Sequence, residues 1–328
     1  MGSDNPDDQP GADLRGARRQ CAEAVLMVRP ASFGYNPETA PTNTLQWPPA
    51  AAGGGEAALA REEHQALAAA LASEGVEVCL VEDTPEPAKP DAAFPNNWVS
   101  FHEDGTVVLY PMQAPSRRRE RREDIIDAVT ARLGFKVARI LDLTSHEAQN
   151  RYLEGTGSLV LDHIERTAYA CLSPRTHTAV VEEWCRELEY EPVIFSAVDR
   201  GGVPLYHTNV MLCIGENLAV VGTEAIVAAD RERVIGRLRG TGRELIELGY
   251  EAIERFGGNM LELGTWDEAL GDSRVLVMSA AARHALTPEA FSRLSACTDQ
   301  VLAVPVPTIE RLGGGGVRCM LAEVFLPA

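Results

Sequence analysis

The sequence predicts an α/β protein built from five similar units that close into a ring. Two strands joined by a tight turn, an amphipathic helix and a further strand recur along the chain. The hairpins begin near residues 98, 158, 208, 260 and 320, at steps of about 50 to 60 residues. The fifth unit is divided between the two ends of the chain, so pairing of its strands would join the N-terminal and C-terminal segments.

The first complete unit shows the pattern most clearly. The stretch WVSFHEDGTVVLYP, residues 98–111, has two apolar runs around Asp104-Gly105, a dipeptide typical of hairpin turns. A helix near 118–133 and the strand VARILDL, residues 137–143, follow. The next two units repeat this order, with hairpins at 158–173 and 209–222, helices near 175–189 and 227–238, and strands at 191–198 and 243–249.

The remaining units are the fourth and the divided fifth. The fourth has a hairpin at 259–279, a helix begun by Thr287-Pro288 and a strand at 300–307. The fifth would pair MLAEVFLP, residues 320–327, with AVLMVRP, residues 24–30, followed by a helix at 56–73 and a strand at 76–82. A hairpin in every unit argues against an open sheet of parallel strands, because parallel neighbours need crossover connections.

The composition excludes several functions. With 30 basic and 48 acidic residues, the net charge of -18 repels nucleic acid and anionic membranes. The one dense basic run, Arg117 to Arg122, is interrupted by Glu120 and is typical of a solvated helix start. No apolar run reaches the about 18 residues of a membrane helix. The seven scattered cysteines lack disulfide or zinc spacing, so we expect a reduced, cytoplasmic protein without a metal.

One domain boundary follows from local composition. Residues 1–22, rich in Asp, Gly and Pro near their start, are predicted to form a disordered tail, and residues 23–328 a single catalytic domain. The segment 31–47 joins the first strand to the first helix. It is either a lid over a pocket or an ordinary surface loop.

The residues just before each hairpin are candidates for chemistry, because they would converge near the axis of a ring. Three of these junctions carry Glu154 in YLEGTGS, His207 in YHTN and Cys319 in GGVRC. A thiolate nucleophile, an imidazole for proton transfer and a carboxylate are the groups that thiol catalysis needs. Each residue also has an ordinary structural interpretation: a buried small hydrophobe, a half-buried surface histidine and a turn carboxylate.

The motifs together match a known family. The matching motifs include PDAAFPNNW, LEGTGSLVLD, HTNVML and GGGGVRCMLAEVFLP, and the match extends from about residue 24 to the end. Through these motifs the chain resembles the pentein superfamily of guanidino-modifying enzymes. It is most similar to the citrulline-utilisation hydrolase branch. The resemblance implies a five-bladed α/β propeller with a pseudo-fivefold axis, closed by the N- and C-terminal strands, and no cofactor.

The resemblance also implies roles for individual residues. Cys319 would be the nucleophile, His207 the acid and base, and Glu154 the carboxylate that holds a substrate nitrogen. The positions that it assigns to the substrate are Asp91 and Asn97 for the guanidinium or ureido group, and Arg117 and Arg175 for the carboxylate. Arg118 and Arg119 could take the place of Arg117.

The asparagines of these junctions bear on the substrate. Related deiminases carry acids where this chain has Asn97 and Asn209, and Asn96 stands beside them. A buried cation needs carboxylates, whereas asparagine suits a neutral ureido group with its own C=O and NH2. The hypothesis is hydrolysis of a ureido acid such as citrulline to ornithine, carbon dioxide and ammonia through a covalent intermediate on sulfur.

Other functions remain open at this stage. Arginine deiminase or dihydrolase activity, dimethylarginine dimethylaminohydrolase activity and amidino transfer all fit the same fold and residues. A non-catalytic binding protein of the same fold is a further alternative, although it would have no need of the three catalytic groups. The expected partner is a small ureido or guanidino amino acid, and the sequence leaves a homodimer open.

Overall fold

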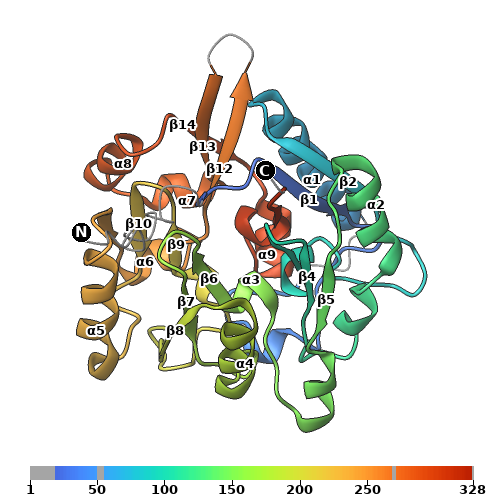
Figure 1. Cartoon of the computed structure of the whole chain (residues 1–328), viewed down its shortest axis with the longest axis horizontal. Coiled ribbons are helices and arrows are strands. Elements are labelled where there is room, and N and C mark those ends of the chain that lie inside the picture. Colours follow the sequence, from blue (N-terminus) through green and yellow to red (C-terminus); the bar gives the residue numbers. More distant parts are fainter. Residues whose placement is uncertain (1–18, 50–54, 268–270, 327–328) are drawn as a thin grey trace, which may run out of the picture.

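The chain contains five similar parts (Figure 1). Each part has two antiparallel strands, then one or two helices, and then a third strand that runs parallel to the second. The computed structural model describes residues 19–49, 55–267 and 271–326. The elements of three units are β3 (Val99–Phe101), β4 (Thr106–Leu109), α2 (Glu123–Leu133), β5 (Arg139–Asp142); β6 (Leu159–Asp162), β7 (Thr167–Cys171), α4 (Thr178–Leu188), β8 (Glu191–Phe195); and β9 (Leu212–Ile214), β10 (Leu218–Val221), α5 (Ala228–Arg239), β11 (Glu244–Glu247). The predicted order of strands and helices is therefore confirmed in these units.

The fourth unit differs from the prediction in its helices. It consists of β12 (Leu261–Asp267), β13 (Gly271–Ser279), α7 (Ala280–Ala285), α8 (Pro288–Ser295) and β14 (Gln300–Val304). The predicted start at Thr287 is confirmed, because its side chain accepts a hydrogen bond from Ala290 N. The short α7, which was not predicted, begins where the side chain of Ser279 accepts a hydrogen bond from Ala282 N.

The two ends of the chain pair as predicted. Strand β15 (Ala322–Val324) runs antiparallel to β1 (Ala24–Arg29), with Ala24 opposite Val324, and α1 (Glu56–Ser73) and β2 (Glu77–Glu82) complete the unit. Val324 also pairs with Phe101 of β3. Two units are consequently joined in one sheet of order β2-β1-β15-β3-β4-β5, while the others form separate three-stranded sheets.

The one dense basic run departs from expectation, whereas the predicted tail is described only in part. Most of the predicted tail, residues 1–18, lies outside the described residues, but Gln20 is buried and its amide donates to the carbonyls of Leu161 and Ile214. The predicted helix near 118–133 begins only at Glu123, after a separate turn, η4 (Arg117–Glu120). That turn is not a solvated helix start, because the side chains of Arg117 and Glu120 are buried.

Short helical turns precede the first strands and meet near the centre of the molecule. They are η3 (Pro95–Asn97), α3 (Gly155–Ser158), η6 (Thr208–Val210) and η7 (Val317–Met320), which follows α9 (Pro307–Gly313). Turn α3 contacts η3 and η6, and η3 contacts η7. The predicted convergence of the junctions is therefore observed for these four. Two further short helices are η5 (Thr144–Gln149) and α6 (Tyr250–Ile253).

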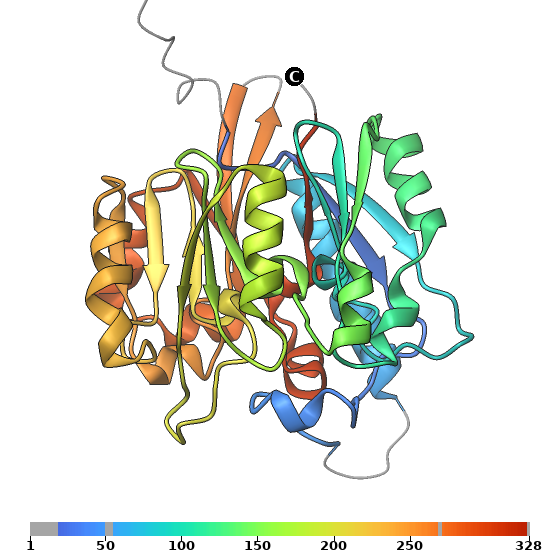
Figure 2. The ribbon, with the colours of Figure 1, turned by 60° about the horizontal axis from the view of Figure 1, so that its bottom comes forward.

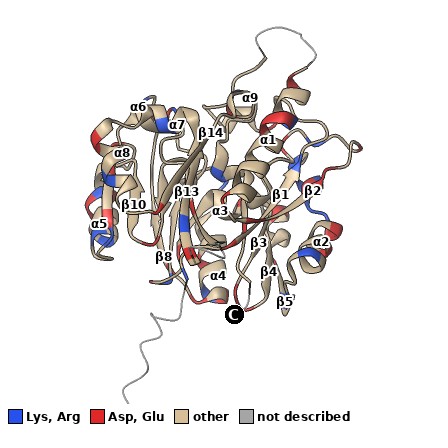
Figure 3. Cartoon of the chain, turned by 90° about the horizontal axis from the view of Figure 1, so that it is seen from above, with Lys and Arg blue, Asp and Glu red and all other residues tan. Residues whose placement is uncertain are grey.

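The longer helices lie outside the strands. Figure 2 shows α5, α4 and α2 around the strands, with the segment at η2 (Ala40–Thr42, blue) beside α9 (red) at the lower end. Apolar residues fill the space between helices and strands; for example, Ile125 and Val129 of α2 pack in one cluster with Phe101. Basic and acidic residues alternate on the outer helices (Figure 3). None of the described helices is long and apolar enough to cross a membrane.

Candidate active site

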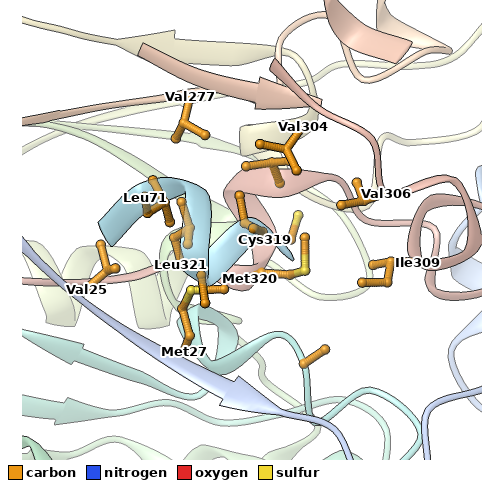
Figure 4. Packing of buried hydrophobic residues seen from close by; sticks show 14 of the residues in the cluster. Val25, Met27, Leu71, Val277, Val304, Val306, Ile309, Cys319, Met320 and Leu321 are labelled. Atoms are coloured by element: carbon orange, nitrogen blue, oxygen red, sulfur yellow. The ribbon is translucent and has the colours of Figure 1, made fainter. Parts of the chain in front are cut away.

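Cys319 lies in η7, at the end of the glycine-rich loop. Its side chain is only 2% exposed and packs in the apolar cluster that contains Met320, Leu321 and Ile309 (Figure 4). The loop approaches its neighbours closely: Gly314 has a φ of 60°, and a Cβ there would lie 2.5 Å from the amide nitrogen of Asn43. Glycine is needed at that position because a larger residue would strain the backbone and clash.

The thiol of Cys319 has polar neighbours despite its burial. The side-chain amide of Asn259 donates to Sγ at 3.3 Å, and Asn209 Oδ1 lies 3.8 Å from the same sulfur. Burial raises the pKa of Cys319 above its usual value, while the bond from Asn259 and the charge of Arg318 act in the opposite direction. Cys319 is thus mainly a thiol at neutral pH.

His207 and Glu154 form a buried hydrogen-bonded pair. Nε2 of His207 lies 2.9 Å from Oε2 of Glu154, and Oε1 of Glu154 accepts the backbone N–H of Gln113 at 3.1 Å. Burial acts to raise the pKa of Glu154, but Arg175, the bond from His207 and Arg117 outweigh it and lower the pKa to about 2. Glu154 is therefore ionised.

The ionised carboxylate determines the state of the imidazole. Burial lowers the pKa of His207 to about 4, even though Glu154 favours the charged form. His207 is neutral at pH 7, and its Nε2 carries the hydrogen because a carboxylate can only accept. Nδ1 is then the unprotonated nitrogen, so the ring can take up a proton.

Arg117 is held by groups of the protein itself. Its Nε and Nη2 donate to the two oxygens of Glu120, each at 2.9 Å, and Nη1 donates to Asn97 Oδ1 at 2.8 Å. Asp91 Oδ2 lies 3.8 Å from Nε. The fork that was expected to grip a substrate carboxylate is thus occupied by Glu120, and that expected role stays a prediction.

Arg175 contacts the segment predicted as a lid or a loop. Its Nη2 donates to the carbonyl of Thr39 at 2.7 Å, and Nε donates to the hydroxyl of Thr42 at 2.9 Å. Nη1 lies 3.5 Å from Oε2 of Glu154. Arg175 therefore joins the carboxylate of the pair to the segment that carries η2.

That segment covers the site. The amide of Asn36 donates to Asp91 Oδ2 at 2.7 Å, and the amide of Asn43 donates to the carbonyl of Gly314 at 3.1 Å. The ring of Phe33 meets that of Phe94 edge to face, with centroids 6.1 Å apart. In this closed arrangement, the pocket beneath has a volume of about 20 Å³, which is room for one water rather than an amino acid.

The pocket brings together most of the predicted site residues. Asp91, Asn97, Arg117, Arg175, His207 and Cys319 line it, whereas Glu154, Asn96 and Asn209 lie in the layer behind. The amide nitrogens of Asn96 and Asn209 are buried without a hydrogen-bond partner in the described part of the chain. In that same part, no group of His, Cys, Asp and Glu has the arrangement of a metal site.

Sequence reasoning missed several residues of the site. Glu120 was assigned to a solvated helix start, and Asn259, at the end of the junction FGGN (residues 256–259), was not among the predicted site residues. Thr39 and Asn43 line the pocket from the segment whose role was undecided. The one signal in the sequence was the position of Asn259 at a junction equivalent to those of His207 and Cys319.

Comparison with known proteins gives a family and a fold. The family described as N,N dimethylarginine dimethylhydrolase, eukaryotic, matches residues 29–326. No curated protein matches the chain. The match supports the predicted membership of the pentein superfamily, whereas the closer likeness to the citrulline-utilisation branch stays a prediction.

Solved structures match at low sequence identity. The N-terminal domain of ArgZ bound to substrate, an arginine dihydrolase from the ornithine-ammonia cycle in Cyanobacteria, has a TM-score of 0.70 and 18% identity, covering 93% of this chain and 98% of that one. Unliganded AgrE gives 0.68 and 18%, covering 93% and 39%. A dimethylarginine dimethylaminohydrolase adduct with 4-chloro-2-hydroxymethylpyridine gives 0.61 and 19%, covering 92% and 99%. At these identities the likeness establishes a shared fold.

Proposed function

The chain belongs to the N,N-dimethylarginine dimethylhydrolase family, and from this premise we propose that it hydrolyses a C–N bond of a guanidino amino acid, with Cys319 as the nucleophile. Hydrolysis of a non-peptide C–N bond follows from the family. The observation that supports the roles of individual residues is that Cys319, His207 and Asp91 line one buried pocket, with Glu154 bonded to the histidine. We also interpret the five units as the blades of a propeller whose centre holds this pocket.

The charges of the pocket favour a cationic substrate. Asp91 lines the pocket and could face a guanidinium, which needs a carboxylate when it leaves water. The pKa of the Cys319 thiol is raised by burial, so the positive charge of a guanidinium beside the sulfur would favour the thiolate. A neutral ureido group would not supply that charge. This reverses the preference that the asparagines suggested from sequence.

The proposed reaction has two steps. The thiol of Cys319 gives its proton to Nδ1 of His207 and its sulfur bonds to the guanidino carbon. The terminal C–N bond then breaks, and the leaving amine or ammonia takes that proton from His207. Water then attacks the S-linked amidino carbon, Nδ1 of His207 accepts its proton, and the thiolate leaves. The products are an amine and a ureido amino acid. Glu154 keeps the imidazole in the required tautomer and stabilises its charged form.

A second round on the ureido product is a further candidate. The observation that favours it is Asn209, whose oxygen lies 3.8 Å from Sγ and whose amide nitrogen has no partner in the described part of the chain. This unused donor could bond the C=O of a ureido group. Citrulline hydrolysis to ornithine, carbon dioxide and ammonia would then follow the first reaction instead of replacing it. ArgZ, a structural match, is an arginine dihydrolase.

Substrate binding requires the segment over the pocket to move. A cavity of about 20 Å³ cannot hold an amino acid, and Asn36, Thr39 and Asn43 form its cover. We therefore propose that residues 31–47 act as a lid. On this proposal, Arg175 would exchange its bonds to Thr39 and Thr42 for a substrate carboxylate when the lid rearranges.

A substrate panel tests the proposal. The purified chain is incubated with arginine, N,N-dimethylarginine and citrulline, and released ammonia, dimethylamine and amino acid products are quantified. We expect turnover of a guanidino acid, loss of turnover in Cys319→Ser, and full activity in Cys297→Ser, which alters a partly exposed cysteine outside the pocket. Activity on citrulline alone would overturn the guanidino preference. Turnover by Cys319→Ser would overturn the assignment of the nucleophile.

Two controls separate the remaining alternatives. Adding an acceptor amine and looking for its amidinated product would reveal amidino transfer in place of hydrolysis. Acid quenching during turnover should trap the amino acid bound to Cys319 through its amidino carbon, visible as added mass on the peptide that contains Cys319. A chain that binds the substrate but yields neither product nor adduct would be a binding protein.

A further inference from the structure

Asn259 contacts the sulfur of Cys319 and is completely buried. Its Nδ2 donates to Sγ of Cys319 at 3.3 Å and to the backbone carbonyl of Asn209 at 2.9 Å. Its Oδ1 accepts the backbone N–H of Arg318 at 3.1 Å. One side chain thus connects the loop of the nucleophile with η6, the turn that follows His207.

The orientation of the amide is determined by groups that have a single hydrogen-bonding role. The N–H of Arg318 can only donate, so it requires the oxygen of Asn259. The carbonyl of Asn209 can only accept, so it requires the NH2 group. A flipped amide would place oxygen against oxygen and nitrogen against N–H, and lose both bonds. The hydrogen that points to the sulfur is therefore imposed by the two backbone groups.

We propose that Asn259 is a positioning residue for the nucleophile, and that its fixed amide donor holds the sulfur of Cys319 and favours the thiolate. The inference rests on the proposed role of Cys319 and adds a residue whose role none of the comparisons assigns. A thiolate accepts a hydrogen bond more strongly than a thiol, since hydrogen bonds to ionised acceptors are stronger. Several interactions lower the pKa of Cys319 against the effect of burial, and the hydrogen bond from Asn259 is the largest of them.

Gly316 lies against the oxygen of the Asn259 side-chain amide, and this contact supports the proposed positioning role. A Cβ on Gly316 would lie 2.6 Å from Oδ1 of Asn259, closer than real contacts allow. The amide is held at three points, so it could not yield without loosening a bond. Gly316→Ala therefore offers a way to displace Asn259 without changing its chemistry.

The test measures the ionisation of Cys319 directly. The full chain, Asn259→Ala and Gly316→Ala are alkylated with iodoacetamide across a pH series, and modification of the peptide that contains Cys319 is followed by mass spectrometry. The ultraviolet absorbance of the thiolate is measured as the difference between each protein and its Cys319→Ser form. It gives the same midpoint and does not depend on whether a reagent can reach the sulfur. Ser279→Ala is the matched control, because it removes a buried hydrogen bond, from Ala282 N, that involves neither Cys319 nor Asn259.

We expect Asn259→Ala to raise the midpoint by about one pH unit, and Gly316→Ala to shift it in the same direction. At a fixed pH below the midpoint, alkylation should slow only about threefold to fourfold, because each thiolate becomes more nucleophilic as its pKa rises. The kcat should fall while KM changes little, and Ser279→Ala should leave the midpoint in place.

The outcomes separate this inference from the proposed function. An unchanged midpoint in a folded Asn259→Ala protein, with only its resistance to urea reduced, would show that Asn259 is merely structural. If Asn259→Ala does not fold, Gly316→Ala decides in the same way. A shifted midpoint together with turnover by Cys319→Ser would leave the effect on the thiol intact and refute the assignment of the nucleophile.

Discussion

Glu154→Gln should both destabilise the protein and stop catalysis, with a pH dependence that identifies the carboxylate. The replacement keeps the shape of the side chain but removes its charge, which faces His207 at 2.9 Å, Arg175 at 3.5 Å and Arg117 at 3.8 Å. The pKa of Glu154 in the folded protein is about 2, against a usual value of 4.5. At about 1.4 kcal/mol for each pH unit, the ionised form contributes about 3 kcal/mol.

The sign follows from the lowered pKa. The contribution is present above the unfolded pKa, near 4.5, and is lost as the pH falls through the folded value, near 2. The difference in unfolding free energy between the wild type and Glu154→Gln should therefore be about 3 kcal/mol at pH 7, and about 1 kcal/mol at pH 3. Urea unfolding of both proteins at several pH values measures this difference.

Activity provides the second measurement. Loss of the carboxylate removes the group that fixes the tautomer of His207, so kcat should fall by a factor of about 10² to 10⁴. Asp162→Asn is the control, since Asp162 is equally buried and bonds Arg243 at 2.6 Å outside the pocket. It should lose stability and keep its kcat. A stability difference that is the same at pH 7 and pH 3, or an unchanged kcat in Glu154→Gln, would refute the reasoning.

Three further predictions concern the lid, the arginine pair and the thiol. Asn36→Ala should raise KM about tenfold with a smaller effect on kcat, because it removes the 2.7 Å bond to Asp91, and initial rates test this. Arg117→Met should lower the free energy of unfolding by about 3 to 5 kcal/mol in urea, because Glu120 is left buried and unpaired. A higher KM without loss of stability would instead indicate that Arg117 binds the substrate. The kcat/KM should still rise between pH 7 and 9, because burial raises the pKa of Cys319, and a plateau beginning below pH 7 would contradict this.

The parts of the fold that the sequence predicts are those with a local cause. Asp104-Gly105 forms the expected turn because Gly105 adopts a φ of 79° and the Asp104 carboxylate accepts the N–H of Thr106. The alternation of apolar residues identified the paired strands. The pairing of Val324 with Phe101, which joins two units into one sheet, has no such signal, because it depends on how the closed chain brings β15 beside β3.

The same distinction applies to the site. Glu154, His207 and Cys319 could be identified because they occupy equivalent positions in a repeat. Glu120 could not, because a carboxylate within a basic run has the same local pattern whether its partner is water or a buried guanidinium. Asn259 contacts sulfur only because residues 209 and 318 fix its amide from distant parts of the chain.

The charge of the substrate should be visible in the pH dependence of catalysis. The kcat/KM reports the pKa of Cys319 in the free enzyme, where burial raises it, whereas kcat reports the pKa in the substrate complex. A bound guanidinium within a few ångströms of the sulfur favours the thiolate, so the rise of kcat should lie at least one pH unit below the rise of kcat/KM. A ureido substrate is neutral and should leave the two rises together. Rates for arginine and citrulline across pH 6 to 10 make the comparison. Coincident rises with arginine would show that the protein alone ionises Cys319, and the electrostatic argument for a guanidino substrate would then lose its basis.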